Sequence, residues 1–418
     1  MDLELLRERF ELAAHAARRG GRGLAVLAIR LEQRKSPGSG NGAPEALLEA
    51  CLLEHLAGCL NRVDTLVPVE PLAFVALLER AEDGPFAVHV ADRVVQALQR
   101  PVRVNGADVD LAAAVGISVF PSDGETLDEL LRGADTAAQA AQASGGQLFG
   151  FHSAPMSERA GRRLALERAL VGVVERNELR LEYQPQIDTR DGRLVGVEAL
   201  LRWHTPRLGW VSPGEFVPIL EASGQIEEVG TWVLRTACSQ ARTWEKDGKP
   251  CRVSANVSAR QLRDGELGEA VRRALDESGL MPELLELELT ESVLVENPAS
   301  TREVIDGVRR MGVRVALDDF GTGYASLAYI RHFPMDALKI DRQFVRGLPV
   351  DAQNAAITSA ITALARSLRL DLVAEGVETE AEEEFLHSLQ CHVVQGYRHA
   401  RPMSAELLGD WRKQRPWA

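Results

Sequence analysis

Residues 313–323 read VRVALDDFGTG, an apolar run that ends in two adjacent aspartates and a glycine-containing loop. Eight short apolar runs follow one another through the C-terminal part of the chain, and helical periodicity fills most of the gaps between them. Such alternation is typical of a mostly parallel sheet, and eight strands over about 240 residues fit a (β/α)8 barrel better than an open sheet. The predicted strands are residues 179–187, 195–203, 252–257, 284–290, 314–317, 337–340, 370–374 and 392–394.

Polar or charged side chains stand at the ends of these strands or one step past them. Buried ionised carboxylates are costly unless they are paired or bound to metal, and several at one barrel mouth repel one another. One lysine cannot neutralise them, whereas divalent cations can, and carboxylate and amide oxygens suit a hard metal such as Mg²⁺ or Mn²⁺. The side chains concerned are Glu198, Asn256, Glu288, Glu291, Asp318, Asp319, Lys339, Asp341, Glu375 and Gln395.

Any one of these residues alone could cap a loop or form a surface pair, so the prediction depends on the whole set. The active sites of (β/α)8 barrels lie at the carboxyl ends of the strands, where these residues fall. Adjacent aspartates allow one carboxylate to bridge two ions, and two divalent ions a few ångströms apart are a known arrangement for cleaving phosphodiesters. The residues therefore predict a two-metal site at the C-terminal face of the barrel.

The composition excludes several classes of protein. The net charge is −13 and the pI about 5.3, so the chain lacks the positive charge typical of a duplex nucleic-acid binder. The five cysteines form no CxxC pair, which favours reduced thiols in a reducing compartment. No signal-peptide core and no apolar run long enough for a membrane span is found, so we expect a cytoplasmic protein.

The first ~150 residues mix helix and strand signals and predict a smaller α/β domain. Strands are expected at residues 24–31 and 73–78, and a hairpin at residues 102–119 with its turn at Asn105-Gly106. A charged helix follows and leads to the barrel. The predicted organisation is an N-terminal domain at 1–154, a connecting helix at 155–178 and the barrel at 179–418.

Many collinear motifs of the barrel resemble the EAL phosphodiesterase family, over about residues 166–403. The resemblance implies a TIM-type barrel that hydrolyses cyclic di-GMP to linear pGpG with two Mg²⁺ or Mn²⁺ ions per site. Through this bacterial second messenger it implies control of biofilm formation or motility. The motifs are YQPQID from Tyr183, EALLR from Glu198, NVSARQL from Asn256, ELTES from Glu288, DDFGTGYASL from Asp318, LKIDRQFV from Leu338, AEGVET from Ala374 and QGY from Gln395.

The resemblance also implies a role for each matching residue. One metal ion would be held by Glu198, Asn256, Glu288 and Asp318. The second would be held with the help of Asp318 and of Asp319, which also belongs to the catalytic set. The attacking water would be positioned by Lys339 and Gln395 and would give its proton to Glu375. The substrate would be contacted by Gln184, Leu201, Arg202 and Asp341. Glu291 would anchor the loop that couples metal binding to dimerisation in the family, here Phe320, Gly321, Thr322 and Gly323.

The N-terminal domain resembles a GGDEF cyclase domain with a degenerate signature. The five signature positions are residues 70–74 (EPLAF), which lack both the glycines that admit GTP and the metal-binding acid pair. Arg30 lies where the family has its other metal-binding aspartate, and Asn61 where the inhibitory product site needs an arginine. We therefore predict no cyclase activity and no product-inhibition site. A structural and dimerising role is favoured over regulation or GTP sensing.

Two alternatives to the phosphodiesterase interpretation stay open. The barrel could bind cyclic di-GMP without cutting it and signal through a protein partner, which the loss of a metal ligand or of Glu375 would favour; none is lost. An unrelated metal-dependent barrel enzyme, such as a lyase, would require the collinear motifs to be coincidental. The predicted partners are cyclic di-GMP and a second copy of the chain, joined through the barrel; the sequence leaves open a regulatory protein partner, the preferred metal and the turnover rate.

Overall fold

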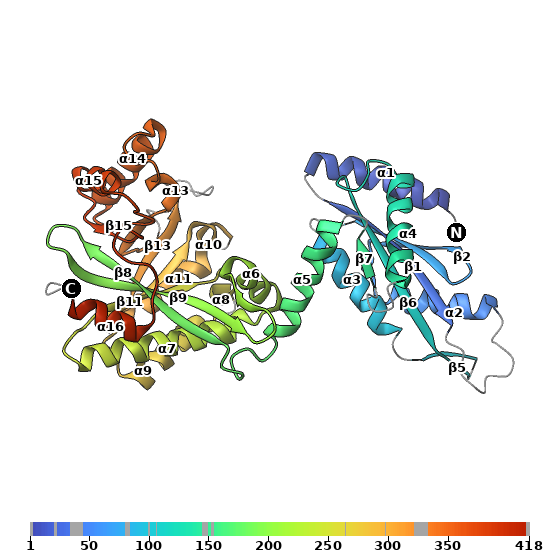
Figure 1. The fold of residues 1–418 in the computed structure, drawn as a ribbon, viewed down its shortest axis with the longest axis horizontal. Helices are drawn as coiled ribbons and strands as arrows, with labels where there is room; N and C mark the ends of the chain where they lie inside the picture. The colour runs from blue at the N-terminus through green and yellow to red at the C-terminus, as the bar shows by residue number, and fades with distance from the viewer. Residues whose placement is uncertain are drawn as a thin grey trace. The chain divides into compact units, whose positions relative to one another are not determined.

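The computed structural model divides the chain into two compact units, residues 1–166 and residues 167–418, and each is described by itself (Figure 1). The structure describes residues 3–20, 23–33, 45–79, 84–98, 101–105, 107–143, 149–151, 154–263, 265–296, 298–321 and 333–414. Within these ranges, no helix combines the length and the apolar character that crossing a membrane requires.

The N-terminal unit is built on a five-stranded sheet with the strand order β2-β3-β1-β6-β7. β7 pairs with β6 in parallel, and the other neighbouring strands are antiparallel. The central strands are buried along most of their length, as expected for a sheet with both faces covered. The strands are β1 (Leu24–Gln33), β2 (Thr65–Glu70), β3 (Ala73–Leu78), β6 (Leu111–Phe120) and β7 (Phe149–Phe151), and a separate hairpin is formed by β4 (Val102–Val104) and β5 (Ala107–Val109).

Two pairs of helices cover the two faces of this sheet. Successive strand residues point to opposite faces, so Val26 and Ala28 of β1 pack with α1 and α4, whereas Leu27 and Ile29 pack with α2 and α3. The helices of this unit are α1 (Leu3–Gly20), α2 (Glu45–Ala57), α3 (Gly84–Ala97) and α4 (Leu127–Ala143). The strands predicted at 24–31 and 73–78 are confirmed as β1 and β3.

The predicted hairpin is present but shorter than expected. β4 and β5 are antiparallel, and Asn105 at their turn has φ 49°, while Gly106 lies outside the described residues. The rest of the predicted second arm belongs to β6, which joins the main sheet. The connecting helix predicted at 155–178 is also shorter: α5 (Ala154–Leu170) ends early, and turns with positive φ at Gly172 and Asn177 lead to the barrel.

The second unit is a closed barrel, which confirms the predicted fold class. Its strands follow the order β9-β11-β12-β13-β14-β15-β16-β8, and pairing of β8 with β9 closes the ring. The strands are β8 (Leu179–Asp188), β9 (Arg193–Thr205), β11 (Arg252–Val257), β12 (Leu285–Thr290), β13 (Arg314–Phe320), β14 (Ala337–Ile340), β15 (Asp371–Ala374) and β16 (Val393–Val394). All eight predicted runs correspond to these strands, and a short additional strand, β10 (Gly209–Val211), pairs back onto β9.

One strand departs from the regular (β/α)8 pattern. The seven strands from β9 to β16 in the ring are parallel, as in other TIM-type barrels, but β8 is antiparallel to both of its neighbours. The chain passes from β8 to β9 through a tight turn in which Gly192 (φ 73°) donates its backbone N–H to the carbonyl of Asp188 at 2.8 Å. Because no helix intervenes, the two strands form a hairpin and must be antiparallel.

Helices follow most of the parallel strands (Figure 1). Local signals fix several of them: Gly224 (φ 85°) ends α6, Asp351 caps α14, and Thr379 with Glu382 forms a capping box at the start of α15. The helices are α6 (Pro213–Ser223), α7 (Ile226–Lys246), α8 (Ala259–Arg263), α9 (Leu267–Ser278), η1 (Pro282–Leu284), α10 (Glu291–Glu296), α11 (Pro298–Arg310), α13 (Arg342–Val345), α14 (Ala352–Leu368), α15 (Glu380–Ser388) and α16 (Ala405–Lys413).

An ion network occupies the amino-terminal end of the barrel. The carboxylate of Glu286, a residue that is 1% exposed, lies 3.0 Å from Arg314 Nε and 3.6 Å from Arg252 Nε, and Arg314 Nη2 lies 2.6 Å from Asp371. These residues begin their strands, so their charges lie at the end of the barrel opposite to the predicted site. The two arginines and the two carboxylates neutralise one another there, so this group presents no net charge at the amino-terminal end of the barrel.

Candidate active site

Four predicted carboxylates meet around Lys339 of β14. The Lys339 side chain is 1% exposed, and its Nζ lies 2.5 Å from Glu375 Oε1, 2.7 Å from Glu288 Oε2, 3.4 Å from Asp318 Oδ1 and 3.5 Å from Glu198 Oε2. The acids lie on β9, β12 and β13 or directly after β15. One buried ammonium group therefore faces four carboxyl groups from four different strands.

Amide side chains hold the Glu198 carboxylate from the other side. Asn256 Nδ2 donates a hydrogen bond to Glu198 Oε1 at 2.8 Å, and Gln395 Nε2 donates to Glu198 Oε2. The same Gln395 nitrogen donates to Gln184 Oε1 at 3.1 Å, while Gln395 Oε1 accepts from Gln186 Nε2 at 3.2 Å. The orientation of the Gln395 amide is thus set by three neighbours, and with it the position of Glu198.

Burial and mutual repulsion shift the pKa values of these acids. Burial and the neighbouring carboxyl groups raise the pKa of Glu288 well above its usual value and raise that of Asp318, although Lys339 opposes both shifts. Burial likewise raises the pKa of Glu375 to about 8. Burial also acts to raise the pKa of Glu198, but Lys339 and the two amide hydrogen bonds outweigh it and lower that pKa. Burial acts to lower the pKa of Lys339, yet the surrounding carboxylates raise it well above the ordinary value.

Asp319 has a different neighbour from Asp318. It adopts φ 54°, and its side chain shares a hydrogen bond with Asp341, which follows β14. Burial, and then the negative charges of Asp318 and Asp341, raise the pKa of Asp319 to about 6. The two adjacent aspartates therefore present their carboxyl groups to two neighbouring parts of the site.

The segment after Asp319 is held by Glu291. Glu291 is 3% exposed, and its Oε2 accepts a hydrogen bond from the backbone N–H of Gly321 at 3.1 Å. Phe320 is buried at the end of β13. The other two residues of the predicted coupling loop, Thr322 and Gly323, lie outside the described residues.

Arg202 lies towards the rim of the barrel and joins a second polar group. Its Nε donates to Glu182 Oε2 at 2.8 Å and its Nη1 to the carbonyl of Leu201 at 3.0 Å. Leu201, Arg202 and Asn256 line one cavity of about 650 Å³ beside α6, α7 and α8, a size common for small-molecule sites. The structure thus places two predicted substrate contacts beside a predicted metal ligand. Of the other two, Gln184 belongs to the amide network around Gln395, and Asp341 contacts Asp319.

The donor set fits hard divalent cations. Both carboxyl oxygens of Glu288 are buried, and within the described chain neither has a hydrogen-bond partner beyond the ionic contact with Lys339. A single ammonium cannot balance four ionised carboxylates, and oxygen-rich clusters of this kind are typical of Mg²⁺ or Mn²⁺ ligands. As the described side chains stand, no three of the His, Cys, Asp or Glu residues are arranged to hold a metal ion, and Lys339 lies between the carboxylates instead.

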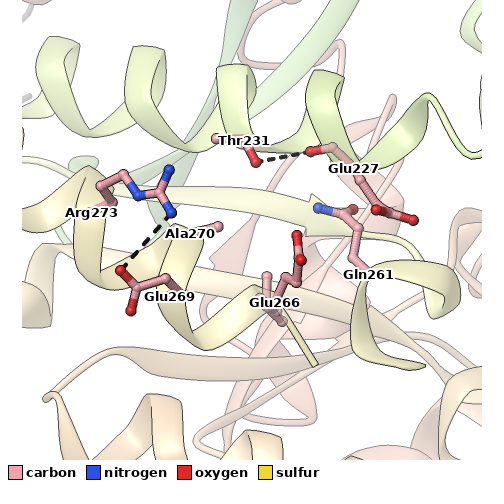
Figure 2. Close-up of a pocket in the computed structure, with 8 residues that line it drawn as sticks. Glu227, Thr231, Gln261, Glu266, Glu269, Ala270 and Arg273 are labelled. Carbon is pink, nitrogen blue, oxygen red and sulfur yellow. Dashed lines mark hydrogen bonds and ion pairs between the residues drawn. The ribbon is translucent and has the colours of Figure 1, made fainter. Parts of the chain in front are cut away.

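A smaller cavity of about 200 Å³ lies between α7, α8 and the start of α9 (Figure 2). Its polar lining includes Glu227, Gln261, Glu266, Glu269 and Arg273. Figure 2 shows the carboxylate of Glu269 paired with Arg273 along α9, at 4.0 Å. The cavity contains none of the predicted site residues, so we place the candidate active site at Lys339 and not here.

The N-terminal unit shows what replaces the predicted cyclase signature. Pro71 and Leu72 form the turn between β2 and β3, and Leu72 adopts φ 60°, a conformation that glycine reaches without strain. Arg30, at the position of the expected metal-binding aspartate, donates from Nε to Asp135 of α4 at 2.7 Å. At position 30, where the resemblance leads us to expect a metal-binding aspartate, a guanidinium group is thus paired with an acid on the neighbouring helix.

Two site residues were missed in the sequence. Gln186 orients Gln395, and Glu182 binds Arg202. Period-two alternation along residues 179–187 puts Glu182, Gln184 and Gln186 on one face of the strand, so the alternation indicates Glu182 and Gln186 together with Gln184.

Comparison with known proteins identifies the families to which the two parts of the chain are similar. The EAL domain model matches residues 163–402, and the diguanylate cyclase GGDEF domain model matches residues 4–147. The bifunctional diguanylate cyclase/cyclic di-GMP phosphodiesterase MucR of Pseudomonas aeruginosa is 38% identical over 406 residues, 97% of this chain and 59% of MucR. The cyclic di-GMP phosphodiesterase NbdA of the same organism is 35% identical over 394 residues, 94% of this chain and 50% of NbdA. The chain thus spans half to three fifths of the length of these relatives.

Solved structures agree with the family match. The structure of the PaMucR phosphodiesterase in complex with c-di-GMP is 44% identical in sequence, with a TM-score of 0.57. The match covers 58% of this chain and 99% of the PaMucR chain. An EAL domain protein from Listeria monocytogenes is 29% identical over 58% of this chain and 95% of its own, with a TM-score of 0.52. The chain belongs to the EAL domain family, and a GGDEF-type domain precedes its EAL barrel.

Proposed function

We propose that the barrel hydrolyses cyclic di-GMP to linear pGpG, and that it needs two divalent cations, Mg²⁺ or Mn²⁺, to do so. The observation that carries this proposal is the Lys339 cluster: four carboxyl groups and one lysine, buried together at the carboxyl end of a barrel. The family match and the relatives named as cyclic di-GMP phosphodiesterases support the substrate.

The residues proposed to hold the cations are the oxygen donors of the cluster. Glu198, Asn256, Glu288 and Asp318 would hold one ion, and Asp319 would join Asp318 at the other. When bound, the ions would stabilise negative charge on the reacting phosphodiester and raise the acidity of the attacking water. Their positive charge would also oppose the burial and the carboxylate repulsion that raise the pKa values of Glu288 and Asp318.

The chain's own groups would then move one proton and orient the reactants. Glu375 is proposed to accept a proton from water, because burial raises its pKa to about 8 and so makes its carboxylate a stronger base than an ordinary glutamate. Lys339 Nζ, 2.5 Å from Glu375, would hold that carboxylate in place. Gln395 would keep Glu198 oriented through its fixed amide, and Arg202 would bind a phosphate oxygen, a task suited to its planar donors. The water oxygen would bond to phosphorus as the bond from phosphorus to the 3′ oxygen breaks, and the 3′ oxygen would leave as a hydroxyl group after taking up a proton from solvent.

For the N-terminal unit we propose a structural or dimerising role without cyclase activity. Leu72 at the signature turn and the Arg30–Asp135 pair support this proposal, because both stand where GTP and its metal would need other groups. The homodimer through the barrel and the cytoplasmic location inferred from the sequence remain parts of the same proposal.

The test is hydrolysis of cyclic di-GMP by the purified chain with Mg²⁺ or Mn²⁺, beside a Glu198→Ala variant and an EDTA control. We expect pGpG from the wild type and none from the variant or with EDTA. Tight binding without turnover in the wild type would move the protein to the alternative class, a cyclic di-GMP receptor that signals through a partner. A wild type that shows no binding and no turnover of cyclic di-GMP would refute both functions.

A further inference from the structure

Glu182 lies on the inward face of β8, one strand step from the catalytic cluster. β8 pairs residue by residue with β9: Arg180 lies opposite Arg202, and Gln184 lies opposite Glu198. Alternate residues of a strand share a face and stand roughly 7 Å apart, so Glu182 lies about that distance above Gln184 towards the rim. It is the acidic residue between the carboxylate cluster and the rim along this strand.

The Glu182 carboxylate bridges two arginines. Its Oε2 accepts from Arg202 Nε at 2.8 Å, and its Oε1 accepts from Arg180 Nη2 at 2.9 Å. The Glu182 and Arg202 side chains are 20% and 21% exposed, and that of Arg180 is 54% exposed. Arg180 is itself placed by Trp210, since its guanidinium carbon lies 3.8 Å from the centre of the indole ring. Arg180 therefore holds the Glu182 carboxylate from the more exposed side, and the carboxylate in turn holds Arg202 on its other side.

This arrangement leaves Arg202 one free edge. Nε is used by Glu182 and Nη1 by the carbonyl of Leu201, and the described residues offer no hydrogen bond to Nη2. Arg202 also lines the 650 Å³ cavity with Asn256. With two of its three nitrogens tied down, the guanidinium loses little freedom when a further acceptor binds to Nη2.

The charges of the group favour an anion at that position. Two arginines and one carboxylate carry a net charge of +1, so Glu182 orients Arg202 without cancelling the attraction for a phosphate, because Arg180 offsets its negative charge. A lone glutamate at this distance from a phosphodiester would repel it, which explains why the second arginine matters.

We propose that Glu182 is a positioning residue for the substrate: it holds Arg202 so that Nη2 meets a phosphate oxygen of the cyclic dinucleotide. The inference rests on the proposed function, because it concerns the same substrate. Glu182 lies a strand step away from the carboxylates, so it acts on substrate binding and leaves the chemical step alone. It therefore affects KM more than kcat.

The test compares Glu182→Ala, Glu182→Gln and the wild type of the full chain with Mg²⁺, for KM, kcat and Tm. Glu277→Ala is the matched control, because Glu277 also binds an arginine, Arg235, at 2.6 Å on the outer helices. We expect Glu182→Ala to raise KM about tenfold with kcat within about twofold. Glu182→Gln keeps KM within about threefold, because its amide oxygen can still accept from Arg202 Nε. Glu277→Ala changes neither.

Isothermal titration calorimetry with a phosphorothioate analogue of cyclic di-GMP measures binding alone, and so tests this inference separately from the proposed function. If the wild type binds the analogue but does not cut cyclic di-GMP, the proposal of hydrolysis fails. The role of Glu182 is then still tested, because Glu182→Ala is expected to bind the analogue more weakly than the wild type does. An unchanged KM and Kd in a folded Glu182→Ala variant would overturn the inference. So would a Glu182→Gln variant as impaired as Glu182→Ala, or a fall in kcat and Tm at unchanged KM. A wild type that neither binds nor cuts refutes both.

Discussion

Replacement of Lys339 by methionine removes the ammonium group from the buried cluster and keeps an unbranched apolar side chain that is one atom shorter. The ammonium group lies within 3.5 Å of four carboxyl groups, and its side chain is 1% exposed. Removing one partner of a buried ion pair costs about 3–5 kcal/mol, because the other charge stays buried. Protonation of the carboxyl groups relieves part of this cost, so we expect the low end, about 3 kcal/mol.

The assay is differential scanning calorimetry of the metal-free protein in EDTA at pH 7.5. A loss of about 3 kcal/mol corresponds to a fall of about 6–12 °C in the Tm of a unit the size of the barrel. Added Mg²⁺ is expected to raise the Tm of Lys339→Met more than that of the wild type, because divalent cations supply the charge that the variant lacks. Lys413→Met is the control: its Nζ lies 2.8 Å from Asp410 in a solvent-exposed pair, whose loss is expected to leave the Tm nearly unchanged.

Three results would refute this reasoning. The first is a metal-free Tm of Lys339→Met within about 2 °C of the wild type, which corresponds to less than about 1 kcal/mol. The second is an equal response of both proteins to Mg²⁺. The third is a fall in Tm as large in Lys413→Met as in Lys339→Met, which would mean that burial of the charge does not decide the effect.

Three further predictions concern other parts of the chain. In EDTA the barrel should lose stability as the pH rises from about 4, where these carboxyl groups titrate in the unfolded chain, through about 8. Burial raises the folded pKa of Asp319 to about 6 and that of Glu375 to about 8, so their contribution to stability is fully present below the unfolded values and is lost as the pH rises through the folded ones. A flat or rising Tm over this range would contradict this, and Mg²⁺ should abolish the slope. Glu291→Ala should remove the hydrogen-bond acceptor of the Gly321 N–H, at a cost of about 1–3 kcal/mol of stability. Hydrogen exchange of that amide should become at least about tenfold faster. Unchanged exchange would show that Glu291 does not anchor the segment. Leu72→Gly should change the stability of the N-terminal unit by less than about 1 kcal/mol, because relief of the strain at φ 60° is offset by the lost packing of Leu72 against the core and by the greater freedom of glycine in the unfolded chain. It should produce no cyclic di-GMP from GTP; a larger change in stability or any synthesis would contradict this.

One physical rule predicts from the sequence that several of these side chains lie together at one end of the barrel. A strand buried in a barrel cannot carry an ionised group along its length without compensation, so Asp318 or Glu375 at the end of an apolar run marks the carboxyl edge of the sheet. That rule needs no knowledge of distant contacts. It places the acids of β9, β12, β13 and β15 and the lysine of β14 at one barrel end, where the structure has them.

Contacts between strands could not be predicted in the same way. Periodicity indicates a strand but gives no direction, so the reversal of β8 depends on the tight turn at Gly192. The pairing of Glu182 with Arg202 requires the register of β8 against β9, which that turn fixes. The placement of Lys339 between the carboxylates is also a property of the closed ring, since its partners come from strands far apart in sequence.

The most direct experiment is hydrolysis of cyclic di-GMP by the full chain with Mg²⁺ in water enriched in ¹⁸O, with mass spectrometry of the product. We expect linear pGpG with one ¹⁸O atom in its terminal phosphate, at a rate that Glu375→Gln lowers by at least about a hundredfold, in the range expected for loss of a general base. Cyclic di-GMP that stays intact under these conditions, or a product without ¹⁸O, would show that the barrel is not a hydrolase of the proposed kind.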